Sequence, residues 1–122
     1  MKQDTSGKGV FRMAITINIY YHGEGESAKA FAREMTETGI VDEIRAREGN
    51  LKYEYFFPMQ DESTVLLIDR WTDQEALDRH HTSPMMARII AIREKYDLHM
   101  SVERYVSDDS GIPDKDKAFI RE

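Results

Sequence analysis

The chain has 122 residues, of which 40% are hydrophobic and 33% are charged, and its formal net charge is −6 at pH 7. This length provides for one hydrophobic core, and the acidic balance lacks the basic stripe that neutralises nucleic-acid phosphates. The absence of cysteine excludes disulfides, thiolate metal ligands and a cysteine nucleophile, and no apolar run is long enough for a membrane span. We therefore expect a single-domain cytoplasmic protein that binds neither nucleic acid nor membrane.

The two ends of the chain differ in composition from its middle. Residues 1–10 are mostly polar and include two glycines, so they bury too little apolar area to offset the entropy of ordering. We predict a flexible leader there, a domain over residues 11–106 and a C-terminal tail over residues 107–122. The tail reads as a loop, although Phe119 and Ile120 are apolar enough to dock on another surface.

The first strand and helix are predicted from the spacing of apolar residues. Within residues 13–22, isoleucines alternate with smaller or polar residues, which is the period of a strand with one apolar face. A helical spacing follows, with Ser27 as the expected N-cap. Gly39 is expected to bend or break this helix, and Gly49 is expected to end it as a C′ residue.

The middle of the chain predicts two further strands. Residues 51–57 alternate, which places Leu51 and Phe57 on the same side as two tyrosines, and Pro58 stops the run. Residues 64–71 are apolar at consecutive positions, so both faces of that strand are apolar. Such a strand is typical of the middle of a sheet.

Two helices and a last strand complete the domain. Thr72 opens a Thr-Asp-Gln-Glu capping box for a short helix that runs to about His81. Ser83 and Pro84 are expected to be the N-cap and first residue of an amphipathic helix. Residues 98–106 alternate again and predict the final strand.

The order βαββαβ predicts an α+β, ferredoxin-like fold, in which an antiparallel sheet carries its helices on one face. The first and third strands are then central, which suits the apolar third strand. Because both sides of the predicted sheet carry large apolar residues, a monomer would expose one apolar face. We therefore expect a homodimer that packs sheet against sheet as a dimeric α+β barrel.

Several short motifs carry a family resemblance that covers about residues 12–106. They are Gly49 to Tyr53, Asp69-Arg70-Trp71, Glu75-Ala76-Leu77 and the run from His80 to Met85. With these motifs the chain resembles the antibiotic biosynthesis monooxygenase (ABM) family and is most similar to its quinol monooxygenases. The resemblance implies a dimeric barrel that oxidises a small hydroquinone or phenolic substrate with dioxygen and without a cofactor.

Two other functions remain open at this point. A dimeric, non-catalytic protein that binds small molecules or serves in stress would use the same aromatic residues. A haem-degrading relative is the other alternative, and Asn18 suits the strand asparagine of that branch. When the chain is aligned with the haem-degrading relatives from Trp71 onward, however, His80 falls where they have a tryptophan. Ile90 falls where they have the haem-ligating histidine. Haem chemistry is therefore the weaker alternative.

Three residues are candidate catalytic groups. His80 and His81 carry imidazoles, which titrate near neutral pH and can accept a phenol proton. Asn18 interrupts an apolar strand, and a buried amide needs hydrogen-bond partners. Helix capping, solvation or a structural hydrogen bond are the alternative roles for these residues. Neighbouring histidines on a helix point in different directions, so we expect no metal site.

Five residues are candidate substrate contacts. Tyr53 and Tyr55 share a strand face and can hydrogen-bond a phenolic oxygen, whereas Trp71 can stack on an aromatic ring. Tyr20 and Met86 complete the expected wall of the site. Core packing or contacts across the dimer are the alternative roles for this group.

Overall fold

The computed structural model describes residues 13–122, so the predicted leader lies outside the described residues. Nine elements follow one another: β2 (Ile15–His22), α1 (Ser27–Glu37), α2 (Ile40–Arg45), β3 (Asn50–Phe56), β4 (Thr64–Trp71), α3 (Gln74–His81), α4 (Met85–Lys95), β5 (His99–Val106) and α5 (Asp114–Lys117). Within residues 13–122, none of the helices has both the length and the apolar composition needed to cross a membrane.

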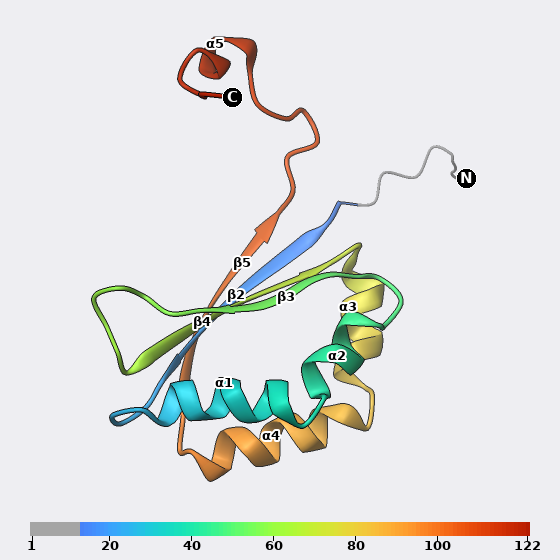
Figure 1. The fold of residues 1–122 in the computed structure, drawn as a ribbon. Coiled ribbons are helices and arrows are strands. Elements are labelled where there is room, and N and C mark those ends of the chain that lie inside the picture. The colour runs from blue at the N-terminus through green and yellow to red at the C-terminus, as the bar shows by residue number, and fades with distance from the viewer. Residues whose placement is uncertain (1–12) are drawn as a thin grey trace.

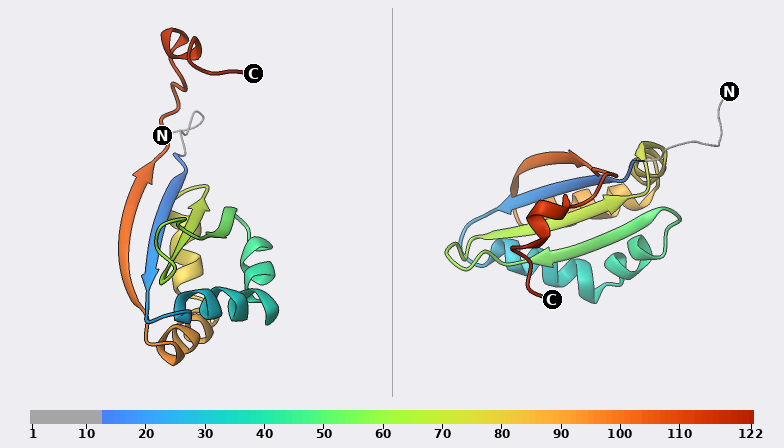
Figure 2. Two further views of the ribbon diagram at one scale, coloured as in Figure 1. Left: turned by 60° about the vertical axis from the view of Figure 1, so that its left-hand side comes forward. Right: turned by 90° about the horizontal axis from the view of Figure 1, so that it is seen from above.

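The four strands form one antiparallel sheet in the order β3-β4-β2-β5. The two strands predicted to be central, β2 and β4, are central. Helices α1 to α4 all lie on one side of this sheet (Figures 1 and 2). The predicted α+β ferredoxin-like fold is therefore confirmed.

The pairing register assigns every strand residue to one of two faces. Tyr21, Val65 and Leu67 point toward the helices and are buried. The residues between them point to the other side, which we call the open face. Its side chains come from all four strands: Thr16, Asn18, Tyr20, Glu54, Phe56, Leu66, Ile68, Arg70, Ser101, Glu103 and Tyr105. Helices α1 to α4 leave this face uncovered (Figure 1).

The core lies between the sheet and the helices. Its largest fully buried side chains come from β4, α1 and α2: Trp71, Phe31, Met35, Ile40, Ile44, Leu67 and Val65. Burying side chains of this size contributes about 1.5–3 kcal/mol each, which is the main stabilisation of such a domain. Buried residues of α3 and α4, such as Leu77 and Ile89, join the same core.

Three helix starts differ from those predicted. Ser27 is the first helical residue of α1, and Glu26 occupies the N-cap without a side-chain hydrogen bond. The N-cap of α3 is Asp73, whose extended backbone lets Oδ1 accept from the Ala76 N–H at 2.9 Å. Ser83 does not cap α4; its hydroxyl donates to the His80 carbonyl at 2.7 Å. Each predicted cap was wrong by one residue because a neighbouring residue takes that position.

Two glycines adopt positive φ for different reasons. Gly39 has φ 85° and separates α1 from α2, as predicted. Gly49 has φ 89° but lies beyond the helix, which ends at Arg45, so its predicted role as a helix C′ residue was wrong. A Cβ at Gly49 would stand 2.5 Å from the Ala76 Cβ, which explains why the chain needs glycine against α3.

A register shift in β3 changes the predicted exposure of one residue. Asn50 pairs with Trp71 and Lys52 pairs with Arg70, so Leu51 is left over as a bulge. Leu51 is 54% exposed, and the prediction that it shares the buried tyrosine face was wrong. The tyrosine face begins at Tyr53 instead.

The C-terminal tail extends away from the helices (Figure 1). Ser107 is its last residue tied to the sheet, because its N–H donates to the Ala14 carbonyl at 3.0 Å and its hydroxyl accepts from Arg70 at 3.2 Å. Beyond it, Phe119 and Ile120 are 90% and 45% exposed. These apolar side chains lack cover in a single copy of the chain.

Candidate active site

A small cavity of about 110 Å³ lies between the sheet and helices α3 and α4. Its lining comes from all four strands and both helices: Ile19, Tyr21, Tyr53, Leu67, Asp69, His80, His81, Met86, Ile89, Ile90, Arg93 and Met100. Most of these residues are apolar or aromatic. The cavity therefore combines a mostly apolar lining with a few titratable groups, which is typical of a small-molecule site.

Asp69 is the charged group on the sheet side of this cavity. The alternation of β4 places it between Leu67 and Trp71 on the helix-covered face, where it is 5% exposed. Its Oδ1 atom accepts the indole N–H of Trp71 at 2.7 Å. Burial raises the pKa of the Asp69 carboxyl to about 7, and the Trp71 hydrogen bond opposes that rise.

His80 lies across the cavity on the last turn of α3 and is 3% exposed. Its ring stacks on Trp71 with centroids 4.9 Å apart and an interplanar angle of 27°. Burial, together with the charges of His81 and Arg47, lowers the pKa of His80 to about 4. The imidazole is therefore neutral at pH 7. Its buried Nδ1 atom has no hydrogen-bond partner among the described residues.

Three tyrosines surround the carboxylate on the same face. Tyr21 and Tyr53 line the cavity, and the ring of Tyr55 meets that of Tyr53 edge to face at 5.9 Å. Burial raises the pKa of all three hydroxyls, and the charge of Asp69 contributes to each rise. These hydroxyls therefore stay protonated at neutral pH and are available as hydrogen-bond donors.

The rim of the cavity is more polar and more accessible. His81 is exposed, and Met86 is half-buried on the first turn of α4. Arg93 also lines the cavity, and its Nη1 atom donates to the Met100 sulfur at 3.5 Å. The rim thus carries a guanidinium and an exposed imidazole beside the apolar side chain of Met86.

The structure divides the eight predicted site residues into two groups. His80, His81, Tyr53 and Met86 line one cavity. Trp71 lies directly behind it, in contact with Asp69 and His80. Tyr55 is beside Tyr53 but borders a different hollow, between α1 and Phe57.

Asn18 and Tyr20 lie on the open face, on the opposite side of the sheet from His80. Asn18 pairs with Ile68 on one side and Glu103 on the other, and its Oδ1 atom is buried without a partner among the described residues. The structure therefore does not bring these two residues to the cavity. Their predicted roles stay predictions.

Sequence reasoning assigned no site role to Asp69, Tyr21 or Arg93. Asp69 could have been identified from the sequence, because strand alternation places its side chain on the same face as the apolar residues Leu67 and Trp71. Arg93 and Tyr21 are distant in sequence from the histidines. They line the same cavity because the tertiary fold brings β2, α3 and α4 together.

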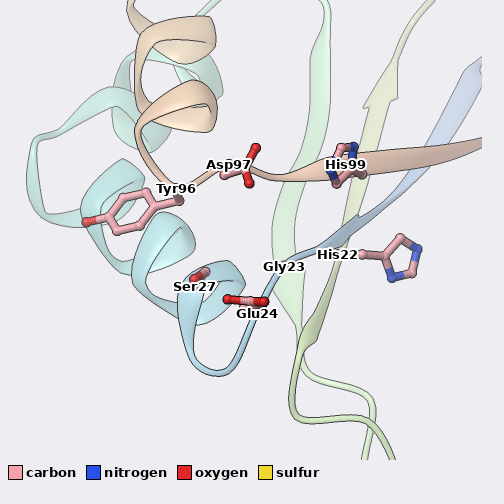
Figure 3. A pocket seen from close by; sticks show the side chains of 7 residues that line it. All are labelled: His22, Gly23, Glu24, Ser27, Tyr96, Asp97 and His99. Carbon is pink, nitrogen blue, oxygen red and sulfur yellow. The ribbon is translucent and has the colours of Figure 1, made fainter.

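A second hollow, larger at about 450 Å³, lies where β2 ends and the chain turns toward α1 (Figure 3). Its lining is His22, Gly23, Glu24, Ser27, Tyr96, Asp97 and His99. Figure 3 shows His22 and Tyr96 pointing in opposite directions, and His22 Nδ1 is engaged with the Thr64 hydroxyl at 2.9 Å. No group of three or more His, Asp or Glu side chains within residues 13–122 is arranged to hold a metal ion. The smaller cavity, with its buried titratable groups, is the better candidate for chemistry.

A comparison with protein families matches residues 14–92 to the family described as "Antibiotic biosynthesis monooxygenase". This span contains every cavity residue except Arg93 and Met100. The chain is also 26% identical over 77 residues to the Bacillus subtilis (strain 168) protein named "Putative monooxygenase YcnE". That similarity covers 63% of this chain and 79% of YcnE.

Solved structures of low sequence identity share the fold. A Bacteroides thetaiotaomicron protein superposes with a TM-score of 0.69 at 15% identity, over 80% of this chain and 100% of its own. SnoaB of Streptomyces nogalater, a cofactor-independent oxygenase, superposes with a TM-score of 0.65 at 14% identity, over 79% and 94%. Pseudomonas aeruginosa PA3566 gives 0.64 at 22% identity, over 80% and 96%.

Proposed function

The chain belongs to the antibiotic biosynthesis monooxygenase family, and on that premise we propose that it is a cofactor-independent monooxygenase of single-ring hydroquinones or phenols. The observation that carries the proposal is the cavity in which Asp69, His80 and Tyr53 meet. An electron-rich phenolate can itself reduce dioxygen. The protein then needs to bind the phenol, remove its proton and stabilise the resulting anion.

The proposed reaction is balanced without a cofactor. A phenol and dioxygen give a quinone and water: one oxygen atom becomes the new ring carbonyl, and the other leaves as water. The two hydrogens of that water come from the phenolic O–H and from the ring C–H that is replaced. A hydroquinone reacts in the same way to give a hydroxyquinone, so the substrate supplies all the electrons.

The size of the cavity supports a single-ring substrate. Its volume is about 110 Å³, which is below the ~150 Å³ of an engineered protein cavity that holds benzene. One aromatic ring therefore enters only if side chains move to enlarge the cavity, and a fused polycyclic substrate needs a much larger movement. Met86, Ile89 and Leu67 supply apolar walls for such a ring.

The polar groups of the cavity suit a phenolic oxygen. The hydroxyls of Tyr21 and Tyr53 remain protonated and can donate to an oxygen that becomes negative. Neutral His80 offers a nitrogen without a protein partner. Because burial excludes water, each of these hydrogen bonds is stronger than on the surface.

The open face supports a homodimer as part of the proposal. Tyr105 of β5 is 50% exposed on this face, which it shares with the half-buried apolar side chains of Tyr20, Leu66 and Ile68. An uncovered sheet face with several large apolar side chains is uncommon on a monomer. Packing two open faces together, as a dimeric α+β barrel, would cover Tyr20. It would also bring side chains of the second copy close to Asn18, whose Oδ1 atom has no hydrogen-bond partner among the described residues.

Oxygen uptake tests the proposed function directly. The purified full-length chain, treated with a chelator, is supplied with a panel of single-ring hydroquinones and phenols, and oxygen consumption and quinone absorbance are recorded together. We expect one quinone per dioxygen consumed. Saturable binding without oxygen uptake across the panel would replace this proposal with the non-catalytic binding protein. A Soret band on haem titration would favour the haem-binding alternative.

A further inference from the structure

We propose that Asp69 is the catalytic base of this site and that its carboxylate takes the proton from the phenolic hydroxyl. The inference rests on the proposed function and assigns the proton transfer to a residue that was not among the catalytic candidates predicted from the sequence. His80, the imidazole in the same cavity, is then a contact for the substrate rather than the proton acceptor.

The position of Asp69 in the sheet carries this inference. It lies on β4, a central strand, with Tyr53 paired opposite it on β3 and Ile17 opposite it on β2. Backbone hydrogen bonds on both sides hold the strand, so the carboxylate has a fixed place in the cavity wall. A base on such a rigid element meets the substrate without a conformational change.

The hydrogen bonding of Asp69 leaves it free to react. Oδ1 accepts from the Trp71 indole, which orients the carboxylate without neutralising it. No Lys, Arg or His side chain forms an ion pair with Asp69 among the described residues. A nearly buried carboxylate without a cation is uncommon, because burying an unpaired charge costs free energy. That cost makes it a stronger base than an ordinary aspartate.

Several other titratable groups face the cavity or its wall. Tyr21 on β2 and Tyr53 and Tyr55 on β3 stay protonated, and His80 and His81 on α3 and Arg93 on α4 complete the set that faces the cavity or its wall. The pKa of Asp69 is about 7 and that of His80 is about 4. Asp69 is therefore the stronger base of the two and is partly ionised at neutral pH.

The proton balance closes within the site. Asp69 takes the hydroxyl proton, and the phenolate passes one electron to dioxygen, which gives a phenoxyl radical and superoxide. These combine to form a C–O bond at the ring, and Asp69 returns its proton to the terminal oxygen of the peroxide. The carboxylate then removes the proton from the ring C–H as the O–O bond breaks, and it passes that proton to the leaving hydroxide to form water. Asp69 ends as the carboxylate.

Asp69→Asn tests this role because the amide keeps the shape and can still accept the Trp71 N–H. We expect kcat to fall by a factor on the order of 10²–10⁴, which is the usual contribution of a general base, while KM changes by only a few fold. The pH profile of the wild-type kcat/KM should rise through about pH 7, and the variant should lose that limb. Asp78→Asn, the same change at an exposed residue of α3, is the matched control and should keep wild-type kinetics.

An anaerobic probe separates this inference from the proposed function. Phenol itself stays neutral in solution from pH 5 to pH 8, so the pH dependence of its affinity reports the ionisation of Asp69. Its affinity for the wild type, measured by calorimetry without oxygen, should rise as pH increases through about 7, because the ionised carboxylate accepts the phenolic O–H. Asp69→Asn should bind phenol with the same affinity across this range, and that pair of results supports Asp69 as the base even if no oxygen is consumed. A pH-independent affinity in the wild type, or a wild-type pH profile in Asp69→Asn, would overturn the assignment.

Discussion

The indole N–H of Trp71 donates to Oδ1 of Asp69 at 2.7 Å, and both side chains are buried on the same face of β4. The two residues are two positions apart, so the strand itself brings them together. Trp71 also stacks on His80. One buried indole therefore connects the acidic and the imidazole side chains of the candidate active site.

Trp71→Phe should raise the basicity of Asp69. The Trp71 hydrogen bond lowers the pKa of the carboxyl, so its removal leaves burial unopposed and moves the Asp69 pKa upward. The apparent pKa in the pH profile of kcat/KM should shift to higher pH by the same amount. Loss of the hydrogen bond should also cost about 1–3 kcal/mol of stability. A shift to lower pH would contradict the role given to the indole.

Asp69 should make wild-type stability fall as pH rises. Its folded pKa of about 7 lies above the ordinary 3.8, so the folded state holds a proton that the unfolded state has released. Stability is highest below about pH 4 for this group and is lost as pH rises toward 7, by at most about 4 kcal/mol.

Urea unfolding of wild type and Asp69→Asn, measured from pH 4 to pH 8, checks this linkage. The difference in unfolding free energy should grow in favour of the variant as pH rises. Other carboxylates contribute equally to both proteins and cancel in that difference. A constant difference across the range would mean that Asp69 is ordinary in acidity.

His80 should have the opposite effect on stability. Its folded pKa of about 4 lies below the ordinary 6.5, so the folded state favours the neutral imidazole. Stability from this group is complete above about pH 6.5 and is lost as pH falls toward 4, by at most about 3 kcal/mol. In His80→Gln, unfolding free energy should therefore decline less on acidification than in the wild type. An equal or steeper decline would contradict a buried neutral histidine.

Tyr105→Glu should break the proposed dimer without harming the fold. Tyr105 is 50% exposed on the open face of β5, so one copy of the chain tolerates a charge there. Between two packed sheets the same carboxylate would be buried without a partner, which costs several kcal/mol. Light scattering after gel filtration should show a dimer for the wild type and a monomer for the variant.

Met59→Glu is the control for this experiment. Met59 is 98% exposed in the β3–β4 connection, away from the open face. This variant should remain dimeric at the same concentration. A wild-type protein that stays monomeric at micromolar concentration, or a Tyr105→Glu variant that stays dimeric, would remove the open face as the interface.

Local patterns in the sequence were sufficient for the order and type of the elements from β2 to β5, whereas the short helix α5 lies in the tail that was predicted as a loop. The consecutive apolar residues of 64–71 predicted a central strand, and β4 is central because hydrophobic residues on both faces must be covered or paired. Gly39 separated two helices as predicted, since few other residues adopt its positive φ. Helix caps were less predictable, because several polar residues near each start compete for the same backbone donors.

The composition of the site depended on the tertiary structure. Strand alternation alone places Asp69 beside Trp71, but it does not say which face the helices cover. Asn18 and His80 both look catalytic in sequence, and they are separated by the thickness of the sheet.

The sequence by itself therefore determined the elements from β2 to β5, their order and, apart from the bulge at Leu51, the two faces of each strand, because these follow from local backbone geometry and side-chain period. Only the tertiary structure decided that Asp69 is buried, without an ion-pair partner among residues 13–122, in a cavity that His80, Tyr53 and Tyr21 also line. The physical reason is that acidity depends on the solvent and charges around a group. Those surroundings come from four strands and two helices that are distant along the chain.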